Sequence, residues 1–240
     1  MDELTAAIKA RELIQRVNVS SIPVQVEPFL TALGCELKVD NGMNPNEPGY
    51  CLSKNGKHVI VVNGKDSDER RRFTTFHEMA HIDLKLPSEH AGSPSWSYAK
   101  RSPNEICCDT YAAELLLPHS FFKPLVDRAE MGLATLDDLA DKFEASFTST
   151  GSRFATTTNI PCAFVVSEGG KIKYAVMSKA LREARAWITR GAIAIVISPV
   201  SRLACGVTFR KTPVSTRSAP DTAVELASEE VVLWDNPIAS

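Results

Sequence analysis

The stretch RRFTTFHEMAHIDL, residues 71–84, places two histidines four positions apart, with a glutamate directly after the first. On an α-helix, residues i and i+4 project from one face about one turn apart, so His77 and His81 can point two imidazoles at a single ion. Glu78 lies on the same turn, close enough to reach a water on that ion without binding the ion itself. This H-E-x-x-H spacing predicts half of a tetrahedral zinc site on a helix.

The alternative is a helix that carries two surface histidines and no metal. The flanking residues argue against it, because apolar side chains surround the motif on nearly all sides: Phe73, Phe76, Met79, Ala80, Ile82, Leu84 and Leu86. A helix that is apolar all round is expected to be buried. Buried His and Glu side chains need partners, and a metal ion supplies one.

A catalytic zinc site usually has three protein ligands, so the third ligand must come from another segment. The stretch NEICCDTYAAELLLPHSFF, residues 104–122, predicts a second helix that stops at its proline. One face of this helix is apolar at one end and carries Glu105, Cys108 and Asp109 at the other. Glu105 is our candidate third ligand. The residues alone leave open the reading of Glu105 as a first-turn acid that complements the helix dipole. Glu114 lies off this face and is expected to be structural.

Together, RRFTTFHEMAHIDL and EICCDTYAAELLLP (residues 105–118) resemble the ImmA/IrrE metallopeptidases, whose pattern is roughly R-F-T-x-x-H-E-x-x-H and then E-x-x-A-N-x-F-A-A-E-L-L-M-P. The resemblance covers about residues 20–150. It implies a zincin-like core in which His77, His81 and Glu105 bind zinc and Glu78 is the catalytic base. It also implies a regulatory protease that cuts a helix-turn-helix transcriptional repressor in response to stress, phage or DNA damage. Among such proteases, the resemblance suggests the CapP type found beside anti-phage operons.

The chain departs from this family pattern where the usual Ala-Asn pair is Cys108-Asp109. Asp109 can still accept an N–H from a ligand imidazole, so we expect it to orient a histidine ring from the side that faces away from the metal. Cys108 lies one turn from Glu105 on the same face, and zinc binds thiolate well. Cys108 could therefore occupy the fourth position as a latent ligand. The alternative is a small buried cysteine where relatives have alanine.

The composition is that of a globular protein without a membrane segment. A chain of 240 residues with 44% hydrophobic content can bury a sizeable core, and its net charge is −2. The first residues, MDELTAAIKARELIQRV, predict an amphipathic helix rather than a secretory signal, and no apolar run approaches about 18 residues. The six cysteines show no paired spacing, which suits a reducing compartment. We therefore expect a cytoplasmic protein.

The pattern of helices and strands predicts an α+β fold in three parts. Residues 1–122 are expected to form the metallopeptidase domain, with a strand at 35–40 and a strand pair within 49–63 before the metal helix. Residues 123–160 predict a helix-turn-helix-like linker, for which packing is a commoner role than DNA reading. Its first helix would bury Leu136, Leu139, Ala140 and Phe143.

Residues 161–240 predict a small C-terminal α+β domain of the sensor kind, which is GAF-like in some members of the resembled family. The run CAFVVSEGGKIKYAVMS indicates a β-hairpin around Glu-Gly-Gly. A helix is expected at about 178–190, followed by strands in AIAIVIS and ACGVTF.

This last part is strongly basic, although the whole chain is nearly neutral. Residues 161–220 contain ten Lys or Arg against two acids, a net charge of +8. Basic surfaces with interleaved aromatic rings, here Phe164, Tyr174, Trp187 and Phe209, suit single-stranded nucleic acid. We expect single-stranded DNA to bind here and to stimulate cleavage, through Lys171, Lys173, Arg182, Arg185, Arg190, Arg210 and Lys211. The other reading is a solvated face with core aromatics, or one covered by the acidic tail.

Two functions from different classes fit these patterns. The first is a zinc endopeptidase, in which Glu78 takes the proton of the attacking water. The second is a non-catalytic DNA- or repressor-binding regulator with a structural metal. An intact Glu78 favours the peptidase, because a structural site needs no base at that position.

Overall fold

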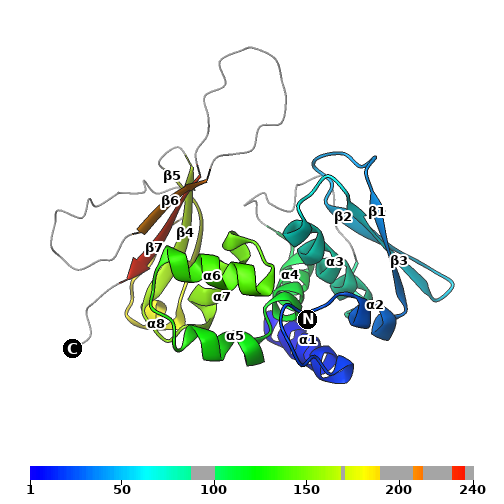
Figure 1. The fold of residues 1–240 in the computed structure, drawn as a ribbon, viewed down its shortest axis with the longest axis horizontal. Helices are drawn as coiled ribbons and strands as arrows, with labels where there is room; N and C mark the ends of the chain where they lie inside the picture. Colours follow the sequence, from blue (N-terminus) through cyan, green and yellow to red (C-terminus); the bar gives the residue numbers. More distant parts are fainter. Residues whose placement is uncertain (88–100, 169–170, 190–207, 213–228, 236–240) are drawn as a thin grey trace, which may run out of the picture. The chain divides into compact units, whose positions relative to one another are not determined.

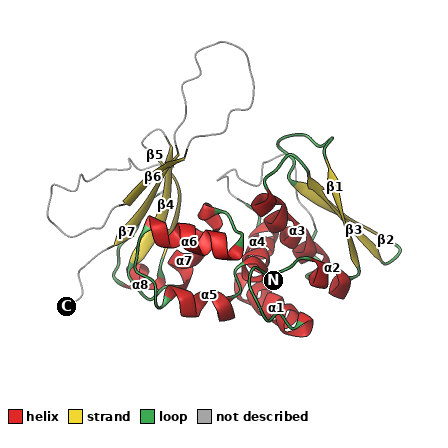
Figure 2. Ribbon diagram, in the orientation of Figure 1, coloured by secondary structure: helices red, strands yellow, loops and turns green. Residues whose placement is uncertain are grey.

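The structure is a computed structural model that describes residues 1–87, 101–168, 171–189, 208–212 and 229–235. Its internal contacts divide the chain into two compact units. The first is Met1–Phe122 with Leu139–Thr150, and the second is Lys123–Asp138 with Gly151–Ser240. Each unit combines helices with a small sheet (Figures 1 and 2), which confirms the α+β class. None of the described helices has the length and apolar character needed to cross a membrane.

The first unit contains a three-stranded sheet in the order β1-β3-β2, with β1 Cys35–Asp40, β2 Gly49–Lys54 and β3 Lys57–Asn63. Strands β1 and β3 are parallel, whereas β2 and β3 form an antiparallel hairpin. The hairpin turns at Asn55 and Gly56, which both have positive φ, as an Asn-Gly two-residue turn requires. These are the strands expected at 35–40 and within 49–63.

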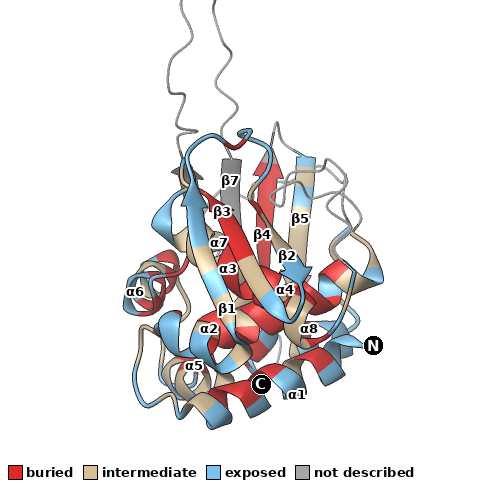
Figure 3. Ribbon diagram, turned by 90° about the vertical axis from the view of Figure 1, so that its right-hand side faces the viewer, coloured by how far each residue is buried: buried red, intermediate tan, exposed pale blue. Residues whose placement is uncertain are grey.

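Four helices complete the layers of the first unit: α1 Glu3–Val17, α2 Glu27–Leu33, α3 Asp68–Asp83 and α4 Pro103–Leu116. Strands β2 and β3 pack on α3, α3 packs on α4, and α4 packs on α1. Figure 3 shows α3 among the buried elements, while β1 is exposed along much of its length. Helices α3 and α4 start in the same way, because the side chains of Ser67 and Ser102 accept the N–H groups of Arg70 and Glu105.

Strand β2 approaches α3 unusually closely at Gly49. A Cβ atom on Gly49 would lie 2.6 Å from Cγ2 of Thr74 and 2.8 Å from the carbonyl oxygen of Val61. Residues two apart on a strand point to the same face, so Cys51 also faces the helix. The contact therefore sets how near the strand can come to the metal motif.

Arg72 connects α3 to two other parts of the first unit. Its guanidinium donates to the carbonyl oxygen of Val24 at 2.6 Å, and to those of Phe143 and Glu144 at 3.2 and 3.0 Å. The last two carbonyls lie at the C-terminal end of α6 (Leu133–Phe143), where a positive charge also complements the helix dipole. The carboxylate of Glu144 adds an ion pair at 2.7 Å.

The second unit contains an antiparallel sheet in the order β5-β4-β7-β6. Its strands are β4 Cys162–Glu168, β5 Lys171–Met177, β6 Thr208–Thr212 and β7 Glu229–Asp235. The β4–β5 pair confirms the predicted hairpin. Gly151 of α7 (Phe147–Thr157) lies directly over Phe164, since a Cβ there would be 2.2 Å from its ring. Phe164 is completely buried, so the prediction that its ring is available for base stacking is wrong.

The helix expected at about 178–190 is much shorter, because α8 spans only Lys179–Glu183. Arg185 takes a positive φ and ends the helical path, and the following Ala186 and Ile188 pack on the sheet residues Ala163 and Val165. The apolar run AIAIVIS lies outside the described residues. One short helix, α5 (His119–Val126), was not expected.

The helix pair predicted within 123–160 is present as α6 and α7. The four residues expected on the buried face of α6 are all buried: Leu136, Leu139, Ala140 and Phe143. Whether this pair is a helix-turn-helix of the DNA-binding kind, and whether the sequence divides into the three predicted domains, stay predictions.

We predict that Gly49→Ala destabilises the protein by about 1–3 kcal/mol, as overpacking commonly does. The new methyl would meet a backbone oxygen of β3 that cannot rotate away. Gly132→Ala is the matched control, because a Cβ at Gly132 meets nothing within 4 Å. Chemical denaturation of both variants measures the difference, and equal midpoints would contradict the close approach.

Candidate metal centre

Helices α3 and α4 bring two imidazoles and one carboxylate together. Nε2 of His77 lies 3.2 Å from Nε2 of His81 and 3.1 Å from Oε2 of Glu105. Nε2 of His81 lies 3.4 Å from Oε1 of Glu105. All three residues are almost fully enclosed, with relative exposures of 5%, 3% and 9%. The structure thus unites the three residues that the sequence proposed as metal ligands.

The spacing of these atoms fits one tetrahedral zinc ion. Ligand atoms at about 2.0–2.1 Å from zinc, separated by tetrahedral angles, lie about 3.3 Å from one another. The observed separations of 3.1–3.4 Å are close to this value, with Oε2 of Glu105 facing His77 and Oε1 facing His81. Two imidazole nitrogens and a carboxylate oxygen are also the donor set of catalytic zinc sites that keep a fourth position open. Both the geometry and the chemistry of the group therefore suit zinc.

The far nitrogen of each imidazole is held by a second group. Nδ1 of His77 lies 3.0 Å from Oδ1 of Asp109, and Asp109 is in turn ion-paired with Arg101. Nδ1 of His81 donates to the carbonyl oxygen of Leu86 at 3.3 Å. With a proton on each Nδ1, both Nε2 atoms are free to bind a metal. Asp109 therefore occupies the place expected of it behind a ligand histidine.

The carboxylates determine the charge on His77 in the metal-free protein. Burial by itself lowers the pKa of His77, but hydrogen bonds to Asp109 and Glu105 outweigh burial and raise the pKa from 6.5 to about 9. His77 is therefore protonated at neutral pH until a metal displaces the proton. Metal binding and loss of this proton are consequently coupled.

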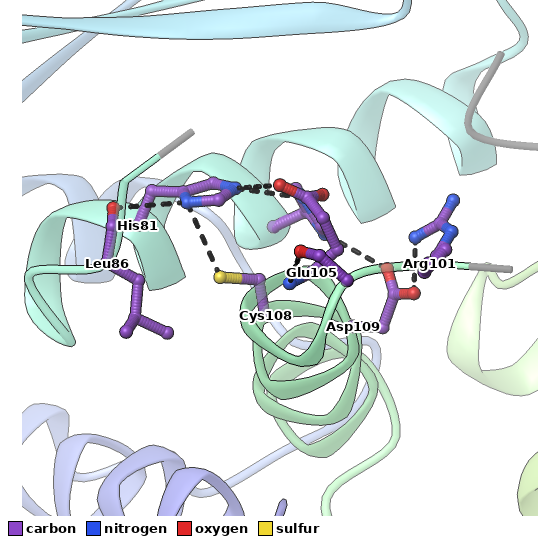
Figure 4. A network of polar contacts seen from close by, with 8 residues as sticks. His81, Leu86, Arg101, Glu105, Cys108 and Asp109 are labelled. Atoms are coloured by element: carbon purple, nitrogen blue, oxygen red, sulfur yellow. Dashed lines mark hydrogen bonds and ion pairs between the residues drawn. The ribbon is translucent and has the colours of Figure 1, made fainter. Parts of the chain in front are cut away.

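Cys108 lies beside the Nδ1 edge of the His81 ring, whereas the candidate donor atom of that ring is Nε2. Its Sγ is 3.6 Å from Nδ1 of His81, whereas Glu105 faces Nε2 of the same ring (Figure 4). Burial, followed by the charge of Glu105, raises the pKa of the Cys108 thiol, so this sulfur is protonated. The position agrees with the small buried cysteine that was the alternative reading. Cys108 as a fourth ligand remains a prediction, and it would require the sulfur to leave Nδ1 and move around the ring.

Glu78 is completely buried on α3, beside the first ligand histidine. Burial, and then the negative charge of Glu78, raise the pKa of the Cys51 thiol on β2 to about 12, so the two side chains lie near each other. Cys51 could not be selected from the sequence, because no local pattern reveals which strand lies over the helix that carries the H-E-x-x-H motif. Arg101 was missed for the same reason, since its role depends on Asp109.

Glu114, the third acid of α4, lies outside the donor group. Its carboxylate accepts the backbone N–H of His119 at 3.0 Å and pairs with Arg11 of α1 at 3.1 Å. It therefore joins α4 to α1 and to the start of α5.

The proposed nucleic-acid-binding residues belong to the second unit. Lys171 and Lys173 of β5, and Arg182 and Arg185 at and after α8, are exposed, as is the ring of the nearby Trp187 at 68%. Arg210 and Lys211 belong to β6, whose side chains are outside the described part of the structure, and Arg190 is outside it altogether. The structure thus describes four of the seven basic side chains.

We predict that Asp109→Asn weakens zinc binding by about 10- to 100-fold, which is typical for loss of a carboxylate behind a ligand histidine. The measurement is competition with a chromophoric chelator. Asp127→Asn is the control, since it removes an exposed carboxylate that forms an ion pair with Lys123 in the second unit. Equal affinities of the two variants would show that Asp109 does not support His77.

Residues 31–154 match the family described as the IrrE N-terminal-like domain, a peptidase family. The chain also resembles a solved structure described as a Mycobacterium tuberculosis transcriptional regulator. That likeness has a TM-score of 0.65 and 14% sequence identity over 98% of this chain and 76% of the other, and it concerns the fold alone. No curated protein matches the sequence. Since the family match spans more than half of the sequence and includes the candidate metal centre, the chain belongs to the ImmA/IrrE family of metallopeptidases.

Proposed function

We propose that this chain is a cytoplasmic zinc endopeptidase with a zincin-like core. The observation that carries the proposal is the convergence of His77, His81 and Glu105 at the spacing of three zinc ligands, with Glu78 on the adjacent position of the same helix. When bound, zinc would act as a Lewis acid on the scissile carbonyl and make water nucleophilic at neutral pH.

The residues of the chain have separate roles in this proposal. His77, His81 and Glu105 hold the ion, while Asp109 and the Leu86 carbonyl fix the two rings. Glu78 accepts the proton of the attacking water and passes it to the leaving amine. Its complete burial keeps bulk water away from this transfer.

Strand β2 offers a surface for an extended peptide. It is an edge of the three-stranded sheet within the described residues, and it lies against the helix that carries Glu78. A peptide that adds to this edge forms main-chain hydrogen bonds independent of its sequence. Alternate side chains of such a peptide would then face α3.

The proposed substrate is a helix-turn-helix transcriptional repressor, cut in a stress, phage or DNA-damage response of the CapP kind. Membership of the ImmA/IrrE family supports a regulatory role for the peptidase. The solved structure described as a transcriptional regulator supports a link to transcription in the same direction.

The alternative is a regulator that binds DNA or a repressor without cleaving it, with a structural metal. Structural zinc sites normally have four protein ligands, whereas three donor groups converge here among the described residues. The open position and the neighbouring Glu78 favour the peptidase.

We predict that Glu78→Gln retains about one zinc per chain and loses cleavage, because the amide cannot accept the proton. His81→Ala should lose both zinc and cleavage. Elemental analysis and incubation with the repressor encoded beside the gene measure these two properties. Cleavage by Glu78→Gln at the wild-type rate would refute the mechanism.

We further propose that single-stranded DNA binds the basic surface of the second unit and stimulates cleavage. Four exposed cations, Lys171, Lys173, Arg182 and Arg185, and the exposed Trp187 ring support this proposal, since stacking on an aromatic ring tolerates any base. Counterion release would make the affinity fall as salt rises.

We predict that a single-stranded oligonucleotide accelerates cleavage, and that reversing the charges of Arg182, Arg185 and Arg190 to Glu abolishes this acceleration. The control reverses three exposed charges of the first unit, Lys9, Lys38 and Lys142. Cleavage assays at low and high salt, with and without the oligonucleotide, make the comparison. Equal stimulation of both variants would reject this surface as the trigger.

A further inference from the structure

Cys51 and Glu78 face each other across the contact between β2 and α3. Cys51 pairs with the fully buried Ile60 of β3, so its side chain points to the helix side of the sheet. Gly49, two residues earlier on the same face, touches Thr74. Two residues along a strand advance about 6.6 Å, and four residues along a helix advance about 6 Å. The next strand residue on this face after Gly49 therefore meets the helix residue one turn after Thr74. These residues are Cys51 and Glu78.

The chemistry of the two side chains agrees with this placement. A buried carboxylate is costly unless it accepts hydrogen bonds, and Glu78 is completely buried. The thiol of Cys51 is such a donor, although a weak one. Burial, and then the negative charge of Glu78 and a hydrogen bond to it, raise the pKa of Cys51 from 9.0 to about 12. The sulfur therefore keeps its proton and can donate it.

We propose that Cys51 is a positioning residue for Glu78: its S–H donates to the carboxylate and holds the base in one orientation on the side of the site away from α4. The terminal torsion of a glutamate has a broad energy profile, so the carboxylate needs such a donor to stay oriented. The proposal rests on the proposed function, because it assigns Cys51 a part in orienting the catalytic base. Its geometric content, a thiol beside a buried carboxylate, can be tested without any substrate.

The first experiment measures the reactivity of the thiol in the zinc-loaded, full-length protein. Iodoacetamide alkylates thiolate, and mass spectrometry of the resulting peptides follows each cysteine separately. Glu78→Gln removes the negative charge that opposes ionisation of Cys51. We expect Cys51 to react about tenfold faster in this variant at the same pH, which corresponds to about one pKa unit.

Cys35 is the internal control in the same sample. It is a half-buried cysteine of β1 whose pKa is raised to about 11 by burial and then by Asp83, without a contribution from Glu78. Its alkylation rate should be the same in both proteins. An unchanged rate for Cys51, or an equal increase for Cys35, would overturn the proposed contact.

The second experiment separates hydrogen bonding from packing. We expect Cys51→Ser, which keeps a donor, to retain most of the kcat of wild type on a repressor that wild type cleaves. Cys51→Ala and Cys51→Val should lower kcat about tenfold or more, with KM and zinc content unchanged.

If Cys51 only fills space, the order is reversed, since valine replaces its volume and serine places a hydroxyl in an apolar contact. That order would reject the positioning role. Failure of wild type to cleave would count against the proposed peptidase and not against the contact, because the alkylation result does not depend on cleavage. Cys35→Ala is the control variant and should leave kcat unchanged.

Discussion

The first unit depends on one constraint, the convergence of two imidazoles with three carboxylates. The imidazoles belong to His77 and His81, and the carboxylates to Glu78, Glu105 and Asp109. The Nε2 atoms of His77 and His81 lie 3.2 Å apart, and each faces one carboxylate oxygen of Glu105. Without metal, a protonated His77 between Asp109 and Glu105 offsets the negative charge of the two carboxylates. The raised pKa of His77 agrees with this charge state. A divalent cation balances them better, because it replaces the proton and satisfies all three donor atoms at once. The packing of α3 on α4 and on the sheet, which buries many apolar side chains, thus also holds these charged groups close together.

The part of this centre that follows from local spacing could be read from the sequence. His77 and His81 are one helical turn apart, so any helix through them brings the rings together. The face of α4 that carries Glu105 and Asp109 could also be derived, because α4 is a regular helix. Which nitrogen of each ring faces inward could not, since that depends on the Leu86 carbonyl and on Asp109. This is why the sequence offered Cys108 as a ligand while the structure places it at Nδ1 of His81.

Contacts between elements explain the remaining differences. The strands at 35–40 and 49–63 follow from alternation and from the Asn-Gly turn, but their order β1-β3-β2 does not. Cys51 acquires its neighbour only through that order and through the absence of a side chain at Gly49. The length of α8 could not be foreseen either, because Arg185 leaves the helical path so that Ala186 and Ile188 cover the sheet.

Arg72 has a consequence for how sequences of this kind can vary. Three consecutive arginines lie near the start of α3 and bind different groups. Arg70 pairs with the Asp66 carboxylate, and Arg71 donates to the Gly64 and Asp66 carbonyls. Arg72 binds groups from two distant segments. A planar guanidinium can donate in several fixed directions, whereas an ammonium group is a single point at the end of a flexible chain. Lysine at position 72 would keep the charge but could not reach Val24 and the end of α6 together. Arginine and lysine are therefore not interchangeable at this position, even though it lies more than a full turn from His77, the nearest candidate metal ligand.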